Sequence, residues 1–285
     1  MTLEGKRIAV TGSTGGLGRE FCTYLAELGA SLVLVDRNPE RSEVHRQSLM
    51  SRFENIDVRC ITLDLEDISS AENVAQRLIE LDTDVFVHNA GVYSIPRHKC
   101  DSGYDNVFQI NFVTPYYIIR RILPALRERG GKVVAVSSIA HAYSGIDEKD
   151  IDFSTRRAAS KVYGNAKRYL TFSLSELFKN ESEAHLAIAH PGISFTGITA
   201  HYPKVIFAII KYPMKLIFMK PKKAALSILE GVLTDTPYCE WIGPRVLDIW
   251  GRPKTKKLRT AKASEREKIS EISENIYKEL REEKL

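Results

Sequence analysis

Short apolar runs alternate with helical patterns along most of the chain. The apolar runs are rich in β-branched residues and are apolar on both faces, which is typical of parallel strands covered by helices on both sides. They span residues 7–10, 31–35, 58–63, 85–88, 133–137 and 186–189. Helical patterns span residues 17–28, 71–81, 104–129 and 158–179. This alternation predicts βαβ units with right-handed crossovers, and therefore a doubly wound α/β fold with a mainly parallel sheet.

The pattern changes after about residue 200. Residues 201–219 are apolar and aromatic, but Pro203, Pro213 and several lysines interrupt them. Such a segment is too apolar for an exposed loop and too broken for a membrane span. We interpret residues 197–223 as a lid, with a core-packing or dimer-interface helix pair, or a peripheral membrane contact through residues 202–223, as the alternatives.

The C-terminal end of the chain is heavily charged and carries one apolar stripe at helical spacing. The stripe consists of Ile269, Ile272, Ile276 and Leu280. One apolar face on a polar background predicts a surface or docking helix and not a second domain. The expected organisation is therefore one α/β domain over residues 1–253, lid included, and a charged helical extension over residues 254–285.

Composition and charge favour an ordinary globular protein over a nucleic-acid-binding one. The chain has 285 residues, of which 44% are hydrophobic and 27% charged, and its net charge is +5. These values fit an ordinary globular chain, and no basic patch with interleaved aromatic residues indicates nucleic-acid binding. The four cysteines have no metal-ligand spacing, so we expect buried free thiols and no metal. No apolar leader precedes the first strand, and a cytoplasmic location is expected.

The first strand ends in a glycine-rich loop that opens a helix. The loop reads Thr11-Gly12-Ser13-Thr14-Gly15-Gly16-Leu17-Gly18. Glycines there allow a tight turn and a close approach of a pyrophosphate to the backbone, and the helix N-terminus offers amide donors. The position between strand and helix is the context that makes such a loop a dinucleotide site.

An acidic residue follows at the end of the second strand. Asp36 lies eighteen residues after Gly18, where a carboxylate can accept hydrogen bonds from the adenosine ribose. Because the same carboxylate would repel a 2′-phosphate, the sequence favours NAD(H) over NADP(H). Arg37 argues the other way, since it could contact a phosphate if Asp36 turns aside.

These motifs resemble the short-chain dehydrogenase/reductase family of the classical type, whose domain is Rossmann-like. The resemblance runs over roughly residues 6 to 200 and includes the loop spacing Thr-Gly-x-x-x-Gly-x-Gly. It continues through Asp64-Leu65, Asn89-Ala90-Gly91, Asn111, Ser137-Ser138, and Pro191-Gly192 with Thr196. The family's tyrosine motif, Tyr-x-x-x-Lys, fits Tyr163 and Lys167. A second register ends in Lys161 but has Arg157 where the tyrosine is required.

The resemblance implies a role for each matching residue. Asn111, Ser138, Tyr163 and Lys167 would be catalytic. The cofactor would be bound by Gly12, Ser13, Thr14, Gly16, Leu17, Gly18, Asp36, Arg37, Asp64, Leu65, Asn89, Ala90, Gly91, Tyr163, Lys167, Pro191, Gly192 and Thr196. Residues four apart on a helix share a face, so the Lys167 ammonium, helped by the oxidised nicotinamide, would lower the pKa of the Tyr163 phenol. Tyr163 would then exchange a proton with the substrate oxygen that Ser138 holds.

The function expected from these residues is an NAD(P)-dependent oxidation of a secondary or lipophilic alcohol, or reduction of the matching carbonyl. The partners would be that small molecule and, as in many family members, further copies of the chain. The alternative is a non-catalytic protein of the same fold that senses dinucleotides or acts as a scaffold. The complete set of four catalytic residues argues against this alternative.

Overall fold

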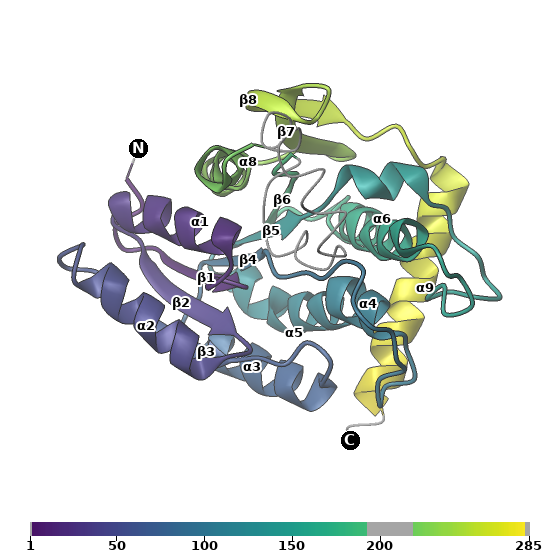
Figure 1. The fold of residues 1–285 in the computed structure, drawn as a ribbon, viewed down its shortest axis with the longest axis horizontal. Coiled ribbons are helices and arrows are strands. Elements are labelled where there is room, and N and C mark those ends of the chain that lie inside the picture. The colour runs from purple at the N-terminus through teal and green to yellow at the C-terminus, as the bar shows by residue number, and fades with distance from the viewer. Residues whose placement is uncertain (1, 193–218, 283–285) are drawn as a thin grey trace, which may run out of the picture.

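The computed structural model describes residues 2–192 and 219–282 (Figure 1). Its strands are β1 (Arg7–Thr11), β2 (Ser31–Asp36), β3 (Val58–Thr62), β4 (Val85–His88), β5 (Lys132–Val136), β6 (His185–Ala189), β7 (Glu240–Val246) and β8 (Trp250–Lys257). Its longer helices are α1 (Gly16–Glu27), α2 (Pro39–Met50), α3 (Ile68–Glu80), α5 (Thr114–Glu128), α6 (Ala159–Leu177), α8 (Pro221–Leu233) and α9 (Ala263–Glu282). Three short helical segments are α4 (Asn106–Phe108), the π-helical η1 (Gln109–Val113) and the 3-10 helix η2 (Ile139–Tyr143).

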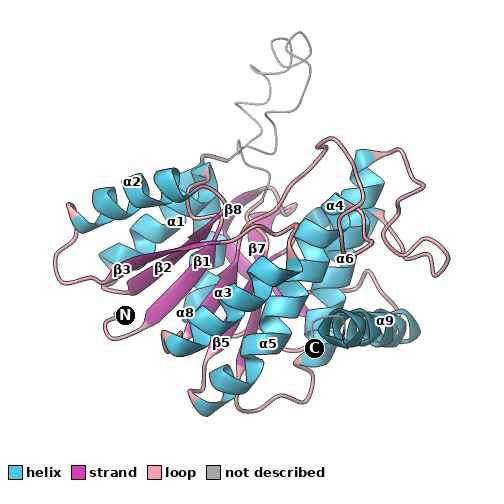
Figure 2. Ribbon diagram, turned by 90° about the horizontal axis from the view of Figure 1, so that it is seen from below, coloured by secondary structure: helices cyan, strands magenta, loops and turns pink. Residues whose placement is uncertain are grey.

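The described strands form one sheet in the order β3-β2-β1-β4-β5-β6-β7-β8. Each neighbouring pair is parallel except β7 and β8, which are antiparallel. Figure 2 shows this twisted sheet with helices packed along it. The doubly wound, mainly parallel α/β fold expected from the sequence is confirmed.

The sheet separates two hydrophobic cores, and successive residues of one strand belong to different cores. In β1, Ile8 and Val10 pack on the side of α1 and α8, whereas Ala9 packs on the side of α3, α5 and α6. All three residues are fully buried. Burial on both faces is the reason that the strands read as continuous apolar runs and not as an alternating pattern.

Several elements differ from the pattern-based expectation. The helix expected over residues 104–129 is broken into α4, the π turn η1 and α5. Helix α2 has no apolar stripe, since its buried residues are only Ser42, His45 and Leu49. Strands β7 and β8 contain glycine and proline, which hide a strand pattern, and they extend the sheet. The domain boundary expected at residues 253–254 falls inside β8.

The C-terminal helix α9 is docked along its apolar stripe. Ile269, Ser273, Ile276 and Leu280 are buried, and the helix packs against α6 and α5. Figure 1 shows α9 in yellow, running beside these two helices. The charged residues of α9 therefore form its outer face, while its apolar stripe packs on the domain.

Two further expectations are affected by the structure. Cys22 and Cys100 are buried as expected, but Cys60 is exposed and Cys239 is partly exposed, so the expectation of buried thiols is wrong for these two. No helix among residues 2–192 and 219–282 is long and apolar enough to span a membrane. Most of the expected lid lies outside the described residues, and its described end, from Met219, leads into α8.

Candidate active site

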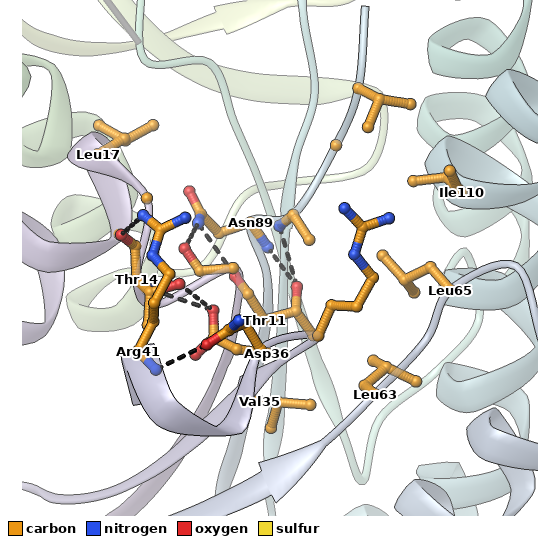
Figure 3. A pocket seen from close by; sticks show the side chains of 18 of the residues that line it. Thr11, Thr14, Leu17, Val35, Asp36, Arg41, Leu63, Leu65, Asn89 and Ile110 are labelled. Atoms are coloured by element: carbon orange, nitrogen blue, oxygen red, sulfur yellow. Dashed lines mark hydrogen bonds between the residues drawn. The ribbon is translucent and has the colours of Figure 1, made fainter. Parts of the chain in front are cut away.

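A pocket of about 350 Å³ lies at the carboxyl edge of the sheet, where the strand order reverses between β1 and β4. In an open α/β sheet this switch point is the usual place of a ligand crevice. Predicted cofactor residues that line it are Gly12, Thr14, Gly16, Leu17, Gly18, Asp36, Arg37, Asp64, Leu65, Asn89, Ala90 and Gly91. Figure 3 shows the pocket with side chains from both halves of the crevice. The fold therefore brings together residues that are dispersed in the sequence.

The glycine loop is held in a conformation that only glycine permits. Gly12 has a φ of +67°, in the left-handed region. A Cβ on Gly18 would lie 2.2 Å from the carbonyl oxygen of Gly12, so this close contact excludes every side chain. Helix α1 begins without a side-chain cap at Gly15, and its first amide groups are free to bind an anion.

Asn89 ties the two halves of the crevice together. Its Nδ2 donates to the carbonyl oxygens of Thr11, at 3.0 Å, and Gly12, at 3.1 Å. Its Oδ1 is buried and has no hydrogen-bond partner among the described residues. An unpaired buried acceptor in a pocket wall fits a ligand that offers a hydroxyl group, as the ribose of a dinucleotide does.

Asp36 is a buried anion whose carboxylate points into the glycine loop. Oδ1 accepts from the amide and the hydroxyl of Thr14, both at 3.0 Å. Oδ2 accepts from the hydroxyl of Ser13 and, at 3.3 Å, from that of Ser42. Figure 3 shows Asp36 turned toward Thr14 with Arg41 beside them. Four donors thus occupy the carboxylate, which has about four acceptor positions.

Ser138 and Tyr163 meet at the far end of the same edge. Ser138 follows β5, and its hydroxyl accepts from the amide of Ala140 at 3.2 Å as the cap of η2. Tyr163 comes from the first turns of α6, and its phenol lies next to the Ser138 side chain, which opposes the rise that burial causes in the phenol's pKa. The ring of Tyr93 packs edge-on against the Tyr163 ring, with 5.3 Å between ring centres. The fold therefore places the two hydroxyl groups side by side.

Lys167 and Asn111 complete the group. The Lys167 Nζ donates to the carbonyl oxygen of Val136 at 3.0 Å and lies 5.7 Å from the centre of the Tyr163 ring. Asn111 Oδ1 and Lys167 Nζ both border Gly91, at 2.7 and 3.6 Å from where a Cβ would be. Asn111 is presented by the π turn η1, a helix distortion that often marks functional sites.

The second tyrosine-motif register does not reach this site. Arg157 is exposed and precedes the start of α6. Lys161 is also exposed, and its ammonium donates to the carbonyl oxygen of Tyr143. The structure thus places Tyr163 and Lys167, and not Arg157 and Lys161, beside Ser138.

Sequence comparison assigns the family. The profile of the short chain dehydrogenase family matches residues 6–148, half of the chain. The chain belongs to the short-chain dehydrogenase family. Human retinol dehydrogenase 13 is 26% identical over 206 residues, covering 70% of this chain and 62% of the relative. Mouse polyprenol dehydrogenase is 25% identical over 254 residues, covering 85% of this chain and 75% of the relative. The match thus spans less than two thirds of the human relative.

Solved structures support the same fold. An uncharacterised protein from Mycobacterium paratuberculosis has a TM-score of 0.79 at 24% identity, covering 97% of this chain and 95% of that one. The Pseudomonas aeruginosa RhlG complex with NADP has a TM-score of 0.61 at 26% identity, with coverages of 81% and 91%. A Burkholderia phymatum dehydrogenase in complex with NAD has a TM-score of 0.61 at 18% identity, with coverages of 82% and 87%.

Burial dominates the proton affinities of the dehydrogenase's tyrosine and lysine. It raises the pKa of Tyr163 to about 12, against an opposing hydrogen bond from Ser138. It lowers the pKa of Lys167 to about 7. Burial opposes the lowering of the Tyr163 pKa that we expect when Lys167 and the oxidised nicotinamide act together, because loss of water disfavours the charged form of both side chains. A phenol that keeps its proton is suited to donate it to a carbonyl oxygen.

Several predicted cofactor residues are not among those that line the pocket. Ser13 is fully buried and does not line the pocket; its hydroxyl binds Asp36. Pro191 and Gly192 follow β6, and Gly192 has a φ of +80°. Thr196 lies outside the described residues.

Several residues at the site had no motif of their own in the sequence. Arg41 and Ile110 are among those that line the pocket, and Tyr93 packs on Tyr163. Arg41 lies five residues after Asp36, in a helix without an apolar stripe, so no pattern singled it out. Tyr93 lies two residues after the Asn-Ala-Gly motif, which was the one signal available for it.

Three buried histidines, His88, His141 and His190, pack against aromatic rings or strand ends. The ring of His190 stacks on Trp241 at 5.2 Å, and that of His141 meets the same tryptophan edge-on at 5.0 Å. His88 is fully buried beside the Thr11 hydroxyl, 3.2 Å away. Burial lowers the pKa of His141 and His190 to about 4, so both rings are neutral near pH 7.

One group within the described residues has the composition of a metal site: Glu66, His98 and Cys100. Asn106 Nδ2 donates to His98 Nδ1 at 3.1 Å, which leaves the ring proton on Nε2. That nitrogen lies 2.7 Å from the Glu66 carboxylate and donates to it. A metal would need this nitrogen deprotonated. The contacts therefore describe a hydrogen-bonded cluster, and we assign it no metal.

Proposed function

We propose that this protein transfers hydride between a nicotinamide dinucleotide and a substrate that is an alcohol in one direction and a carbonyl compound in the other. The observation that carries the proposal is the contact of Ser138 with Tyr163 next to Lys167 and Asn111, at the end of a dinucleotide-shaped crevice. A sensor or scaffold of the same fold would need only the crevice, so the complete catalytic group favours an enzyme.

Each side chain has a defined part in the proposed reaction. Ser138 donates a hydrogen bond to the substrate oxygen and stabilises charge that develops there. The Tyr163 phenol gives its proton to that oxygen during reduction and takes it back during oxidation. The Lys167 ammonium, with Asn111 beside it, exchanges the proton with solvent. The cofactor, held by Gly12, Gly18 and Asn89, supplies or accepts the hydride when bound.

The cofactor preference that we propose differs from the sequence expectation. Discrimination in favour of NAD(H) required an Asp36 carboxylate that faces the ribose. Four donors within the protein engage this carboxylate instead. Two guanidinium groups, those of Arg37 and Arg41, line the same pocket. Guanidinium groups favour a phosphate over a hydroxyl, so we propose that NADP(H) binds at least as tightly as NAD(H).

The relatives named retinol dehydrogenase and polyprenol dehydrogenase support a lipophilic alcohol or carbonyl as the substrate class. The segment expected to cover the substrate, with the membrane and dimer alternatives for residues 202–223, lies mainly outside the described residues. A cytoplasmic or peripheral location and a homo-oligomer stay predictions.

An activity screen tests the proposal. The protein is incubated with short-chain and long-chain alcohols or carbonyl compounds and each of the four cofactor forms, and nicotinamide absorbance is followed. We expect turnover, with the lowest KM for lipophilic substrates and a Kd for NADPH no higher than that for NADH. Tight dinucleotide binding without turnover of any substrate would instead favour the sensor. Clearly tighter binding of NADH would restore the sequence-based preference.

A further inference from the structure

Helix α6 carries a buried guanidinium directly after its catalytic lysine. Arg168 is 4% exposed, although arginine is seldom buried without a partner. Four of its N–H groups donate, and its guanidinium also lies 5.3 Å from the centre of the Phe172 ring. None of these contacts is used by the proposed chemistry, so the residue requires another explanation.

The charge of Arg168 is matched by the C-terminal part of the chain. Glu265, in the first turn of α9, accepts from Nε and from one terminal nitrogen, both at 2.7 Å. The carbonyl oxygen of Thr260 accepts a further bond at 2.6 Å. This is a two-pronged Arg–carboxylate pair, the strongest and most directional kind of ion pair. It joins residues that are 97 positions apart.

The remaining donor of Arg168 reaches the catalytic turn. Its other terminal nitrogen donates to the carbonyl oxygen of His141 at 2.8 Å. His141 in turn binds the carbonyl oxygen of Ser138 through its amide, at 3.1 Å, and its ring Nδ1, at 2.6 Å. The position of the Ser138 backbone is thus connected through His141 and Arg168 to the first turn of α9.

Close packing makes this connection rigid. A Cβ on Gly164 of α6 would lie 2.6 Å from the carbonyl oxygen of Ala140, so η2 and α6 touch backbone to backbone one residue after Tyr163. The Ser144 hydroxyl also donates to the Lys161 carbonyl oxygen at 2.8 Å. Any shift of η2 along α6 would move Ser138 relative to Tyr163.

We propose that Arg168 and Glu265 are positioning residues: they form a clamp by which α9 holds Ser138 in hydrogen-bonding distance of Tyr163. The inference rests on the proposed function, because it assigns the C-terminal helix a part in that same site. Neutralising Glu265 leaves the buried guanidinium without its counter-charge, which weakens its hold on His141. A displacement of about 1 Å at the reacting groups can reduce turnover about 100-fold.

The test compares two glutamates of α9 that differ in what their partners touch. Glu265 binds Arg168, whereas Glu274 binds Arg120 and Tyr116 of α5, and the side chains of the two glutamates are 24% and 28% exposed. We expect Glu265→Gln to lower kcat about 10-fold to 100-fold with the Kd for NADPH unchanged. Glu274→Gln should keep the wild-type kcat, although it also loosens α9. Equal kcat values in the two variants would overturn the clamp.

A double variant covers the case in which Glu265→Gln fails to fold. Arg168→Met with Glu265→Met removes both charges and so avoids an unpaired buried ion. We expect this variant to fold and bind NADPH, but to keep a kcat about 10-fold or more below wild type, because nothing donates to the His141 carbonyl oxygen. A folded double variant with wild-type kcat would show that the clamp does not position Ser138.

Amide hydrogen exchange supplies a readout that does not depend on turnover. In Glu265→Gln the amides of Ala140 and His141 should exchange faster than in wild type, while in Glu274→Gln they should not. If wild type turns over no substrate, the proposed function fails, and the exchange data still decide the clamp. If neither amide exchanges faster in Glu265→Gln than in wild type, that result alone excludes the clamp.

Discussion

The glycine loop and the turn that follows Ser138 are each held by a buried charged side chain, Asp36 and Arg168, and the two charges are compensated in different ways. Asp36 accepts from neutral donors on Ser13, Thr14 and Ser42, all within 23 residues of it. Arg168 depends on Glu265, 97 residues further along the chain. Both groups lie at the carboxyl edge of the same sheet, and both hold a backbone turn that carries function.

The difference separates a locally assembled region from a remotely assembled one. The glycine loop is held mainly by β1, α1, β2 and the start of α2, which are consecutive in the chain, and Asn89 adds hydrogen bonds from beyond β4. The turn that begins at Ser138 needs α6 and also the chain beyond β8. We therefore expect changes in the two regions to affect different steps, namely cofactor binding in the first and turnover in the second.

The largest expected effect separates turnover from cofactor binding. Tyr163→Phe removes the proton donor but keeps the ring that packs on Tyr93. Steady-state kinetics should show kcat reduced about 10²-fold to 10⁴-fold, the usual contribution of a general acid or base. The Kd for NADPH, measured by the fluorescence of the cofactor, should stay within about two-fold of the wild-type value. A variant that retains near wild-type kcat would exclude Tyr163 as the proton donor.

A change at Asp36 should act on the loop as a whole. Asp36→Ala leaves the donors of Ser13 and Thr14 unpaired, so the free energy of unfolding should fall by about 2 kcal/mol. The Kd for NADH and that for NADPH should rise together, by about ten-fold, because roughly 1.4 kcal/mol of lost loop order corresponds to that factor.

The matched control for Asp36 is its neighbour Arg37, which lines the pocket without holding the loop. Arg37→Ala should weaken NADPH alone. If Asp36→Ala instead weakens only NADH, the carboxylate recognises the ribose, and the comparison between the two buried charges loses its basis.

The last prediction concerns stability and pH. Lys167 is buried and its pKa is lowered from 10.5 to about 7. Between these two pH values the unfolded chain binds more protons at this residue than the folded one, so stability rises with pH over that window. Relative to Lys167→Met, wild type should gain up to about 1.4 kcal/mol per pH unit from pH 7 to pH 10. Denaturant unfolding of both proteins at several pH values measures this; a constant difference would show that the amine is not buried as described.

Sequence patterns alone determined the order of the strands through β6 and the position of most motif residues relative to them. Two-sided burial makes parallel strands continuous apolar runs, and glycine is required where a Cβ meets backbone, as at Gly18. These requirements concern single residues and their neighbours, so they can be recognised in the sequence. Tyr163 and Lys167 could be placed on one face of a helix for the same reason.

Only the tertiary structure decided what the charged residues do. The sequence places Asp36 at the end of β2, and the structure adds that its carboxylate accepts from Ser13 and Thr14 of the glycine loop. The sequence makes the C-terminal helix an extension, and the structure shows that Glu265 there pairs with Arg168, the residue after Lys167. The sequence cannot show that burial raises the pKa of Tyr163 in the protein without cofactor. Orientation, ion pairing and desolvation depend on groups that the fold brings together from distant positions, and no local pattern encodes them.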